Sequence, residues 1–142
     1  MCIRDRPNDI LSGTVDLTLI ATGTAPSSLS CASATSSMIL TIFPAAIANA
    51  GSDDDVCEGL TYTLTGTSAS NNTGVSWTSS GTGTWTNGNT LTPTYDPSAA
   101  DIAAGSVTLT LTSIGNAPCS DATSTMVLTV IPNPIPGPIW HN

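Results

Sequence analysis

Apolar residues recur at every second position in several short segments of the chain, where they alternate with threonine and serine. A period of two places the apolar side chains of a β-strand on one face of a sheet. Turn-forming residues separate these segments, and one such dipeptide, Asn87-Gly88, suits a tight hairpin turn. No segment shows helical periodicity of useful length. The pattern predicts strands at 60–65, 74–79, 81–86, 89–95, 105–114 and 123–131.

The alternation also predicts which side chains face the core. Two sheets packed face to face would bury these apolar sets, so we expect an all-β, antiparallel sandwich. Residues 96–105 are not strand-like, and we expect them to cross between the sheets, with Pro97 and Gly105 starting and ending one helical turn. The predicted core residues are Leu60, Tyr62, Leu64, Val75, Trp77, Leu91, Tyr95, Val107, Leu109, Leu111, Met126, Leu128 and Val130.

Two parts of the chain match each other when the sequence is compared with itself. Residues 9–19 and 101–111 are identical at seven of eleven positions and lie 92 positions apart. Residues 34–42 match 122–130 at a separation of 88, because the first copy carries a four-residue insertion at 27–30. The matched pairs predict that both copies contain the same strand hairpin.

The matches predict the organisation of the chain. Residues 7–43 form the C-terminal part of a truncated repeat, with the expected last hairpin. Residues 44–131 form one complete repeat of 88 residues, a size that suits an immunoglobulin-like sandwich. Residues 132–142, which are rich in proline, open a third repeat or form a linker.

The first six residues differ in character from the rest of the chain. They contain both basic residues, Arg4 and Arg6, and one of the four cysteines, Cys2. We interpret residues 1–6 as a non-native leader, similar to a translated adapter remnant; the alternative is a genuine polar N-terminus. Cys2 is therefore left out of the cysteine pairing.

Charge excludes some partners. The chain has a net charge of −8, and no lysine or arginine follows Arg6. Nucleic-acid binding requires cations that neutralise phosphates, and an anionic membrane surface also attracts basic residues, so we expect neither partner. No apolar run is long enough to span a membrane. The chain also shows no signal peptide, so we expect an exported protein whose true N-terminus lies upstream.

Several motifs resemble those of a known family. They are Cys57-Glu58-Gly59, Trp77, the segment 81–85 and the segment 93–111. Together they resemble the PKD-like/Ig-like tandem repeats of large cell-surface proteins of Bacteroidetes-type bacteria, over residues 7–131. The resemblance implies β-sandwich modules in tandem, exported to the cell surface, in adhesin or gliding-type proteins. It supplies no catalytic motif.

Cys57 and Cys119 are the two cysteines of the complete repeat. An exported domain of this size is expected to contain oxidised cysteines. A bridge between these two would contribute roughly 4 kcal/mol by constraining the unfolded chain. The alternative is that they lie at opposite ends of the sandwich, so that bridges link neighbouring copies and Cys31 pairs with a partner missing from this chain.

Metal binding has one weak candidate. Asp53, Asp54, Asp55 and Glu58 could contribute oxygens to a calcium site, and the alternative is a solvated acidic turn. Zinc requires four ligands, whereas the chain has a single histidine, His141, and no Cys-x-x-Cys motif. We therefore expect no cofactor, with calcium as the one open candidate.

Catalysis finds no support in the pattern of residues. A Ser-His-Asp triad cannot be assembled within 44–131, because His141 lies beyond that repeat. Trp77 and Trp85 could form a platform for stacking a carbohydrate; the alternative is that Trp77 belongs to the core and Trp85 packs between the sheets or at an edge.

These observations predict a non-enzymatic structural or interaction module. We expect it to act as a stalk or spacer of a secreted or cell-surface repeat protein, in contact with neighbouring repeats and with an extracellular glycan or protein as a further candidate partner. The alternative function is that of a carbohydrate-binding accessory module of a secreted polysaccharide-degrading enzyme. An exposed coplanar tryptophan pair would favour the second function, and buried tryptophans would favour the first.

Overall fold

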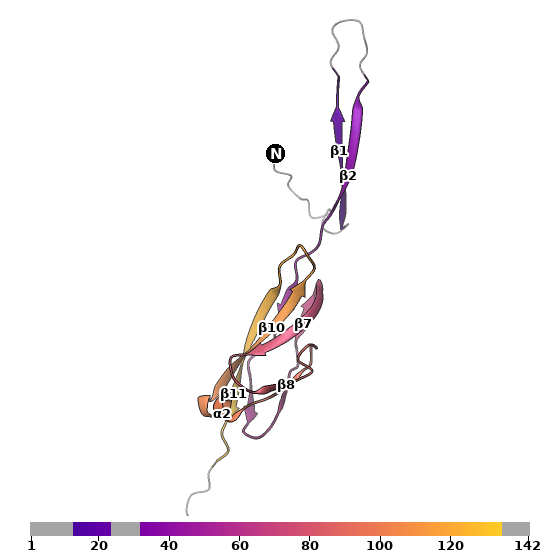
Figure 1. Cartoon of the computed structure of the whole chain (residues 1–142). Coiled ribbons are helices and arrows are strands. Elements are labelled where there is room, and N and C mark those ends of the chain that lie inside the picture. The colour runs from indigo at the N-terminus through magenta and orange to yellow at the C-terminus, as the bar shows by residue number, and fades with distance from the viewer. Residues whose placement is uncertain (1–12, 24–31, 135–142) are drawn as a thin grey trace, which may run out of the picture. The chain divides into compact units, whose positions relative to one another are not determined.

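The structure is a computed structural model that describes residues 13–23 and 32–134 (Figure 1). The chain divides into two compact units on either side of the bond between Pro44 and Ala45. Strands dominate both units, and the one described helix has six residues. The predicted all-β class is therefore confirmed.

The first unit is a hairpin of two long strands, β1 (Thr14–Ala21) and β2 (Ala34–Thr41), which pair antiparallel. Its apolar side chains remain largely accessible to solvent, with Leu19 71% and Met38 60% exposed. The alternation in this segment thus produces strands whose apolar face has no covering layer within the described part of the unit.

The second unit contains the remaining strands and the helix. A four-stranded sheet has the order β4-β11-β10-β7, a three-stranded sheet has the order β5-β9-β8, and β3 pairs with β6. The bounds are β3 (Ile47–Asn49), β4 (Asp54–Cys57), β5 (Tyr62–Thr63), β6 (Ser68–Ser70), β7 (Asn72–Ser79), β8 (Thr84–Thr86), β9 (Thr94–Asp96), α2 (Ala99–Ala104), β10 (Ser106–Gly115) and β11 (Ala122–Ile131).

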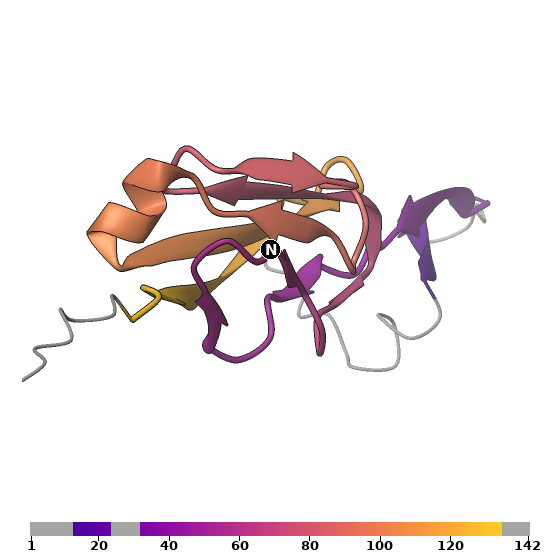
Figure 2. The same cartoon turned by 90° about the horizontal axis from the view of Figure 1, so that it is seen from below.

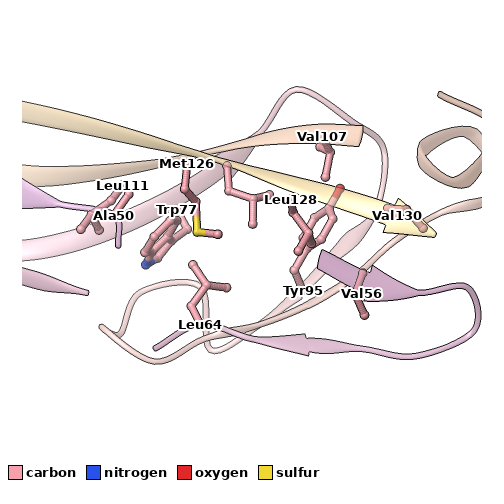
Figure 3. Close-up of a cluster of buried hydrophobic side chains, with 11 residues drawn as sticks. Ala50, Val56, Leu64, Trp77, Tyr95, Val107, Leu111, Met126, Leu128 and Val130 are labelled. Atoms are coloured by element: carbon pink, nitrogen blue, oxygen red, sulfur yellow. The ribbon is translucent and has the colours of Figure 1, made fainter. Parts of the chain in front are cut away.

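The core of the second unit lies between these layers (Figure 3). Leu109, Leu111 and Leu128 project from the four-stranded sheet and are fully buried. Leu64 and Tyr95, which belong to the opposite layer, are fully buried as well and pack in the same core. The other core residues are Ala50, Val56, Trp77, Val107, Met126 and Val130. Each fully buried leucine contributes about 1.5–3 kcal/mol relative to an exposed position.

The two long hairpins share one register. Val15 pairs with Leu40 and Leu17 with Met38 in the first unit. In the second unit, Val107 pairs with Leu128 and Leu109 with Met126. These partners are the residues that the sequence repeat aligns, at separations of 92 and 88 positions. Because a slip of one residue would turn every side chain to the other face, the shared register means that both hairpins present the same apolar face.

The chain enters the second unit at one end and leaves it at the other (Figure 1). The loop between β10 and β11 lies at the end where the chain enters, called here the N-terminal end. Helix α2 lies at the opposite, C-terminal end, near the last residues of β11, as both views show (Figures 1 and 2). The ends are joined by β10 and β11, each of ten residues and therefore about 33 Å long.

Several predictions for the second unit need correction. The strands expected at 81–86 and 89–95 are only three residues long each, as β8 (Thr84–Thr86) and β9 (Thr94–Asp96). Leu60 is 59% exposed, because the chain turns at Gly59 and the strand begins only at Tyr62. Asn87 does adopt a positive φ of 57°, but β8 pairs with β9 across a longer loop instead of a two-residue turn. The sheet is not wholly antiparallel, since β4 runs parallel to β11 at its edge.

Candidate functional site

The most densely bonded polar cluster of the second unit surrounds Asp101, which is only 3% exposed. Its Oδ1 accepts a hydrogen bond from the backbone N–H of Thr82 at 3.0 Å. Its Oδ2 accepts from the backbone N–H groups of Gly83 (2.9 Å) and Ser98 (3.0 Å) and from the Tyr95 hydroxyl (2.8 Å). The carboxylate thereby joins the β8 turn, β9 and helix α2.

These hydrogen bonds decide the ionisation of the carboxyl group. Burial acts to raise the pKa of Asp101, but the hydrogen bonds from Ser98, Tyr95 and Thr82 outweigh burial, so the pKa lies below its ordinary value of 3.8. A buried carboxylate is tolerated when donors replace its lost hydration, and four donors do so here. The cluster consequently has a structural role, because it links the three segments that it joins.

The local sequence explains how this hydrogen-bonded cluster forms. Ser98 caps α2: its Oγ accepts from the Asp101 backbone N–H at 3.2 Å, while Asp101 bonds back to the Ser98 N–H. This reciprocal pair is a capping box, and Gly105 ends the helix with a φ of 78°. A Cβ at Gly81 would overlap the Asp101 carboxylate, and one at Gly83 would overlap Tyr95. The Gly-Thr-Gly segment thus lets its backbone approach the carboxylate.

The two tryptophans do not form an exposed platform. Trp77 is 4% exposed, and its Nε1 donates to the backbone oxygen of Thr90 at 3.1 Å. Its ring centroid lies 5.7 Å from that of Trp85, with the planes tilted by 33°. Trp85 is partly buried and packs against Tyr95 at 4.8 Å between centroids. Trp77 is therefore a core residue, and Trp85 packs beside it.

Two of the four acidic calcium candidates, Asp53 and Asp54, accept hydrogen bonds through their carboxylates near the start of β4. Asp53 Oδ1 accepts from the Val127 N–H at 2.7 Å. Asp54 Oδ1 accepts from the Asp55 N–H at 2.9 Å, and Asp54 Oδ2 accepts from the Tyr62 hydroxyl at 2.8 Å.

The fourth candidate of this set, Glu58, accepts from the backbone N–H of Asn133 at 3.0 Å. Within residues 13–23 and 32–134, no three His, Cys, Asp or Glu side chains come together in a way that could hold a metal ion. The arrangement observed is closer to an acidic turn that anchors neighbouring backbone than to a calcium cage.

A shallow polar depression of about 310 Å³ lies beside two of these aspartates. Burial and the bond to Asp54 raise the pKa of Tyr62 to about 12, so its hydroxyl remains a donor at neutral pH. The lining residues are Asn49, Gly51, Ser52, Asp53, Asp54, Tyr62, Thr65 and Gly66.

Cys57 and Cys119 lie at opposite ends of the second unit. Cys57 pairs with Ile131, the last residue of β11, whereas Cys119 lies in the loop that precedes Ala122, its first residue. The ten residues of β11 span about 33 Å, and a disulfide requires Cα atoms within about 7 Å. No disulfide joins them, and the first of the two expected pairings is not formed in this structure.

Several candidate residues lie outside the described part of the chain: Cys2, Cys31 and His141. Of the described helices, none has the length and apolar character needed to cross a membrane. Comparison with protein-family models and with curated proteins finds no match to this sequence.

Sequence reasoning found the cysteines, the tryptophans and the acidic turn, but it missed Asp101 as a centre of hydrogen bonding. The signals were nevertheless present in the sequence. Ser98 and Asp101 have capping-box spacing, and glycines flank Thr82.

Proposed function

We propose that the chain is part of a tandem-repeat, immunoglobulin-like (PKD-like) β-sandwich protein and that its repeats act as spacers in a secreted or cell-surface stalk. The observation that carries the proposal is the shared register of the two long hairpins, together with their matching sequences. Repetition of one folding unit along a chain is the mark of an extended, quasi-one-dimensional protein.

The path of the chain through the second unit supports a spacer. The chain enters at one end and leaves at the other, so a following copy would begin at the end opposite to the one where the preceding copy began. The buried polar groups of this unit serve its own fold, as the Asp101 cluster illustrates. The surface is rich in threonine and serine and carries acidic groups, which keeps such a stalk soluble.

The carbohydrate-binding alternative loses its main support. It required an exposed and coplanar pair of tryptophans, whereas Trp77 is buried and its ring is tilted by 33° against that of Trp85. The non-enzymatic role is proposed because the polar cluster of the second unit is occupied by its own hydrogen bonds.

Small-angle X-ray scattering tests the spacer function. Chains with one, two and four copies of residues 44–131 would be compared at the same mass concentration. The expected result is a maximum dimension that grows by roughly 30–40 Å per copy, the length of a ten-residue strand with its end loops. Copies that fold back on one another, with a dimension that grows only as the cube root of mass, would contradict a stalk.

A further inference from the structure

At the C-terminal end of the second unit, the departing chain is held beside Cys57. The Glu58 N–H donates to the Ile131 oxygen at 2.8 Å. Two residues further on, Asn133 donates from its backbone N–H to Glu58 Oε2 at 3.0 Å and from its Nδ2 to the Glu58 oxygen at 3.2 Å. These bonds fix the start of the following segment next to the exposed Cys57.

At the N-terminal end, the arriving chain is held near the loop that contains Cys119. Asn71 Nδ2 donates to the Ala45 oxygen at 3.1 Å. The adjacent Asn72 pairs with Gly115. A Cβ at Gly115 would lie only 2.7 Å from the Cys119 oxygen, so the loop lies directly against this pair. Ala45 and Cys119 thus belong to the same end of the unit.

Because the copies follow one another along the chain, the C-terminal end of one copy is joined to the N-terminal end of the next. Pro44 corresponds to Pro132 at the separation of 88 positions, so Asn133 takes the place of Ala45 in the following copy. The residue that Glu58 holds at the end of one copy is therefore the second residue of the next. The Cys57 of one copy and the Cys119 of the next lie on the two sides of a single junction.

Exposed apolar side chains occur at both ends. Leu60 (59% exposed) and Ile131 (43%) lie beside Cys57. Ile47 (57%) and Ile114 (39%) lie at the end where the chain enters. Apolar residues that stay exposed on an isolated repeat are expected to become buried when a second copy docks against them. We therefore expect these two apolar pairs to form the surface that a neighbouring copy covers at the junction.

We propose that Cys57 of each repeat forms a disulfide with Cys119 of the repeat that follows it, and that the flanking apolar residues pack across the same junction. The proposal rests on the proposed function in one respect, since it requires copies that follow one another head to tail. It accounts for the separation of the two cysteines within one copy and for the recurrence of a cysteine at the matching positions 31 and 119.

The bond forms by thiol–disulfide exchange with a low-molecular-weight disulfide, such as oxidised glutathione. The thiolate of one cysteine attacks a glutathione sulfur, forms a mixed disulfide and releases one glutathione thiolate. The second cysteine thiolate then attacks the cysteine sulfur of the mixed disulfide and displaces the other glutathione. Two protein thiols are oxidised, one glutathione disulfide is reduced, and the two protons of the protein thiols are taken up by the two released glutathione thiolates.

The test uses the chain through residue 131 followed directly by a second copy of residues 44–131, with Cys2→Ser and Cys31→Ser. Four thiols remain, two per complete copy. After refolding with oxidised and reduced glutathione, thiol titration should count two thiols lost. Because the two copies have identical sequences, the pairing is assigned by substitution: a chain with Cys119→Ser in the first copy and Cys57→Ser in the second should still lose two thiols. Loss of two thiols from a chain that keeps both cysteines in one copy and none in the other, or four surviving thiols in the parent, would overturn the proposal.

The matched control carries Cys57→Ser in the first copy only, which should retain all three remaining thiols under the same conditions. If the serine variant lost two thiols equally well, the pairing would be different from the one proposed. Scattering on the same chains separates the two proposals. A missing bridge with an unchanged length increment per copy rejects the disulfide alone, whereas a collapsed dimension rejects the spacer function.

Discussion

Replacing Asp101 by asparagine removes one charge and turns one hydrogen-bond acceptor into a donor. The new side chain would keep a single carbonyl oxygen, which can accept from the Thr82 N–H as Oδ1 does now. Its amide group would occupy the place of Oδ2 and face the N–H groups of Gly83 and Ser98, which are donors themselves. The Tyr95 hydroxyl can rotate to accept a bond, and its oxygen already accepts from the Gly83 N–H at 3.1 Å, so the Ser98 N–H is the group that loses its acceptor.

The magnitude follows from the Ser98 N–H. A buried donor that loses its acceptor costs about 1–3 kcal/mol, so Asp101→Asn should reduce the free energy of unfolding of the second unit by about 1–3 kcal/mol. For a domain of this size, that corresponds to a fall in the thermal midpoint of roughly 5–25 °C. The matched control is Asp96→Asn, which removes the same charge from an exposed position on β9 and should stay within about 0.5 kcal/mol of the parent.

The dependence on pH provides a second readout. Because the pKa of Asp101 is lower in the folded chain than its ordinary value of 3.8, the ionised group stabilises the fold above that value, and this contribution disappears as the pH falls through the folded pKa. Urea unfolding followed by tryptophan fluorescence would measure the difference between parent and variant at pH 7 and below pH 3. A difference of less than about 0.5 kcal/mol at pH 7 would refute the structural role of the cluster.

Three further substitutions test other parts of the structure. Leu111→Ala should cost about 2–5 kcal/mol in urea unfolding because the side chain is fully buried, whereas Leu19→Ala at the matching position, 71% exposed, should change the same transition by less than about 0.5 kcal/mol. Ser113→Ala should leave stability unchanged or raise it by about 1 kcal/mol, because the buried Oγ has no hydrogen-bond partner among the described residues; a loss above about 1 kcal/mol would contradict this. In a spectrophotometric titration, Tyr62 should ionise at about pH 12 and at a lower pH in Asp54→Ala, since its pKa is raised by burial and then by the bond to Asp54; an unchanged titration would show that the bond has no effect.

The long hairpins were predictable from the sequence because two independent signals agree there. Alternation assigned Val107, Leu109 and Leu111 to one face, and the internal repeat predicted the same hairpin twice. All three residues are buried, and both hairpins have the register that the repeat requires. Strong periodicity over eight to ten residues leaves few alternatives, because any other register would expose the whole apolar set.

The short strands could not be placed from the same pattern. Strands β3 and β6 have three residues each, which is too short for a period of two to stand out. Leu60 continued the alternation of its segment but lies outside the strand, because the turn at Gly59 precedes it. Parallel pairing of β4 with β11 depends on residues about 74 positions apart, a relation that no local pattern encodes.

The cluster around Asp101 shows a different limit of sequence reasoning. Its carboxylate is satisfied by backbone N–H groups at positions 82 and 83, which every residue type except proline could provide. Only the flanking glycines and the cap at Ser98 mark the site, and such glycines also occur in ordinary turns. The cysteines, in contrast, were recognisable as candidates, and their separation was one of two alternatives between which β11 decides by placing them at its two ends.

Pulling on a single molecule tests the spacer function most directly. In a chain of several copies of residues 44–131, each unfolding event should lengthen the molecule by about 260 Å, since 88 residues extend to about 300 Å and the folded copy already spans about 35 Å. We predict a regular series of such steps, one for each copy, in the presence of a reductant. A smooth extension without steps would contradict an array of folded repeats.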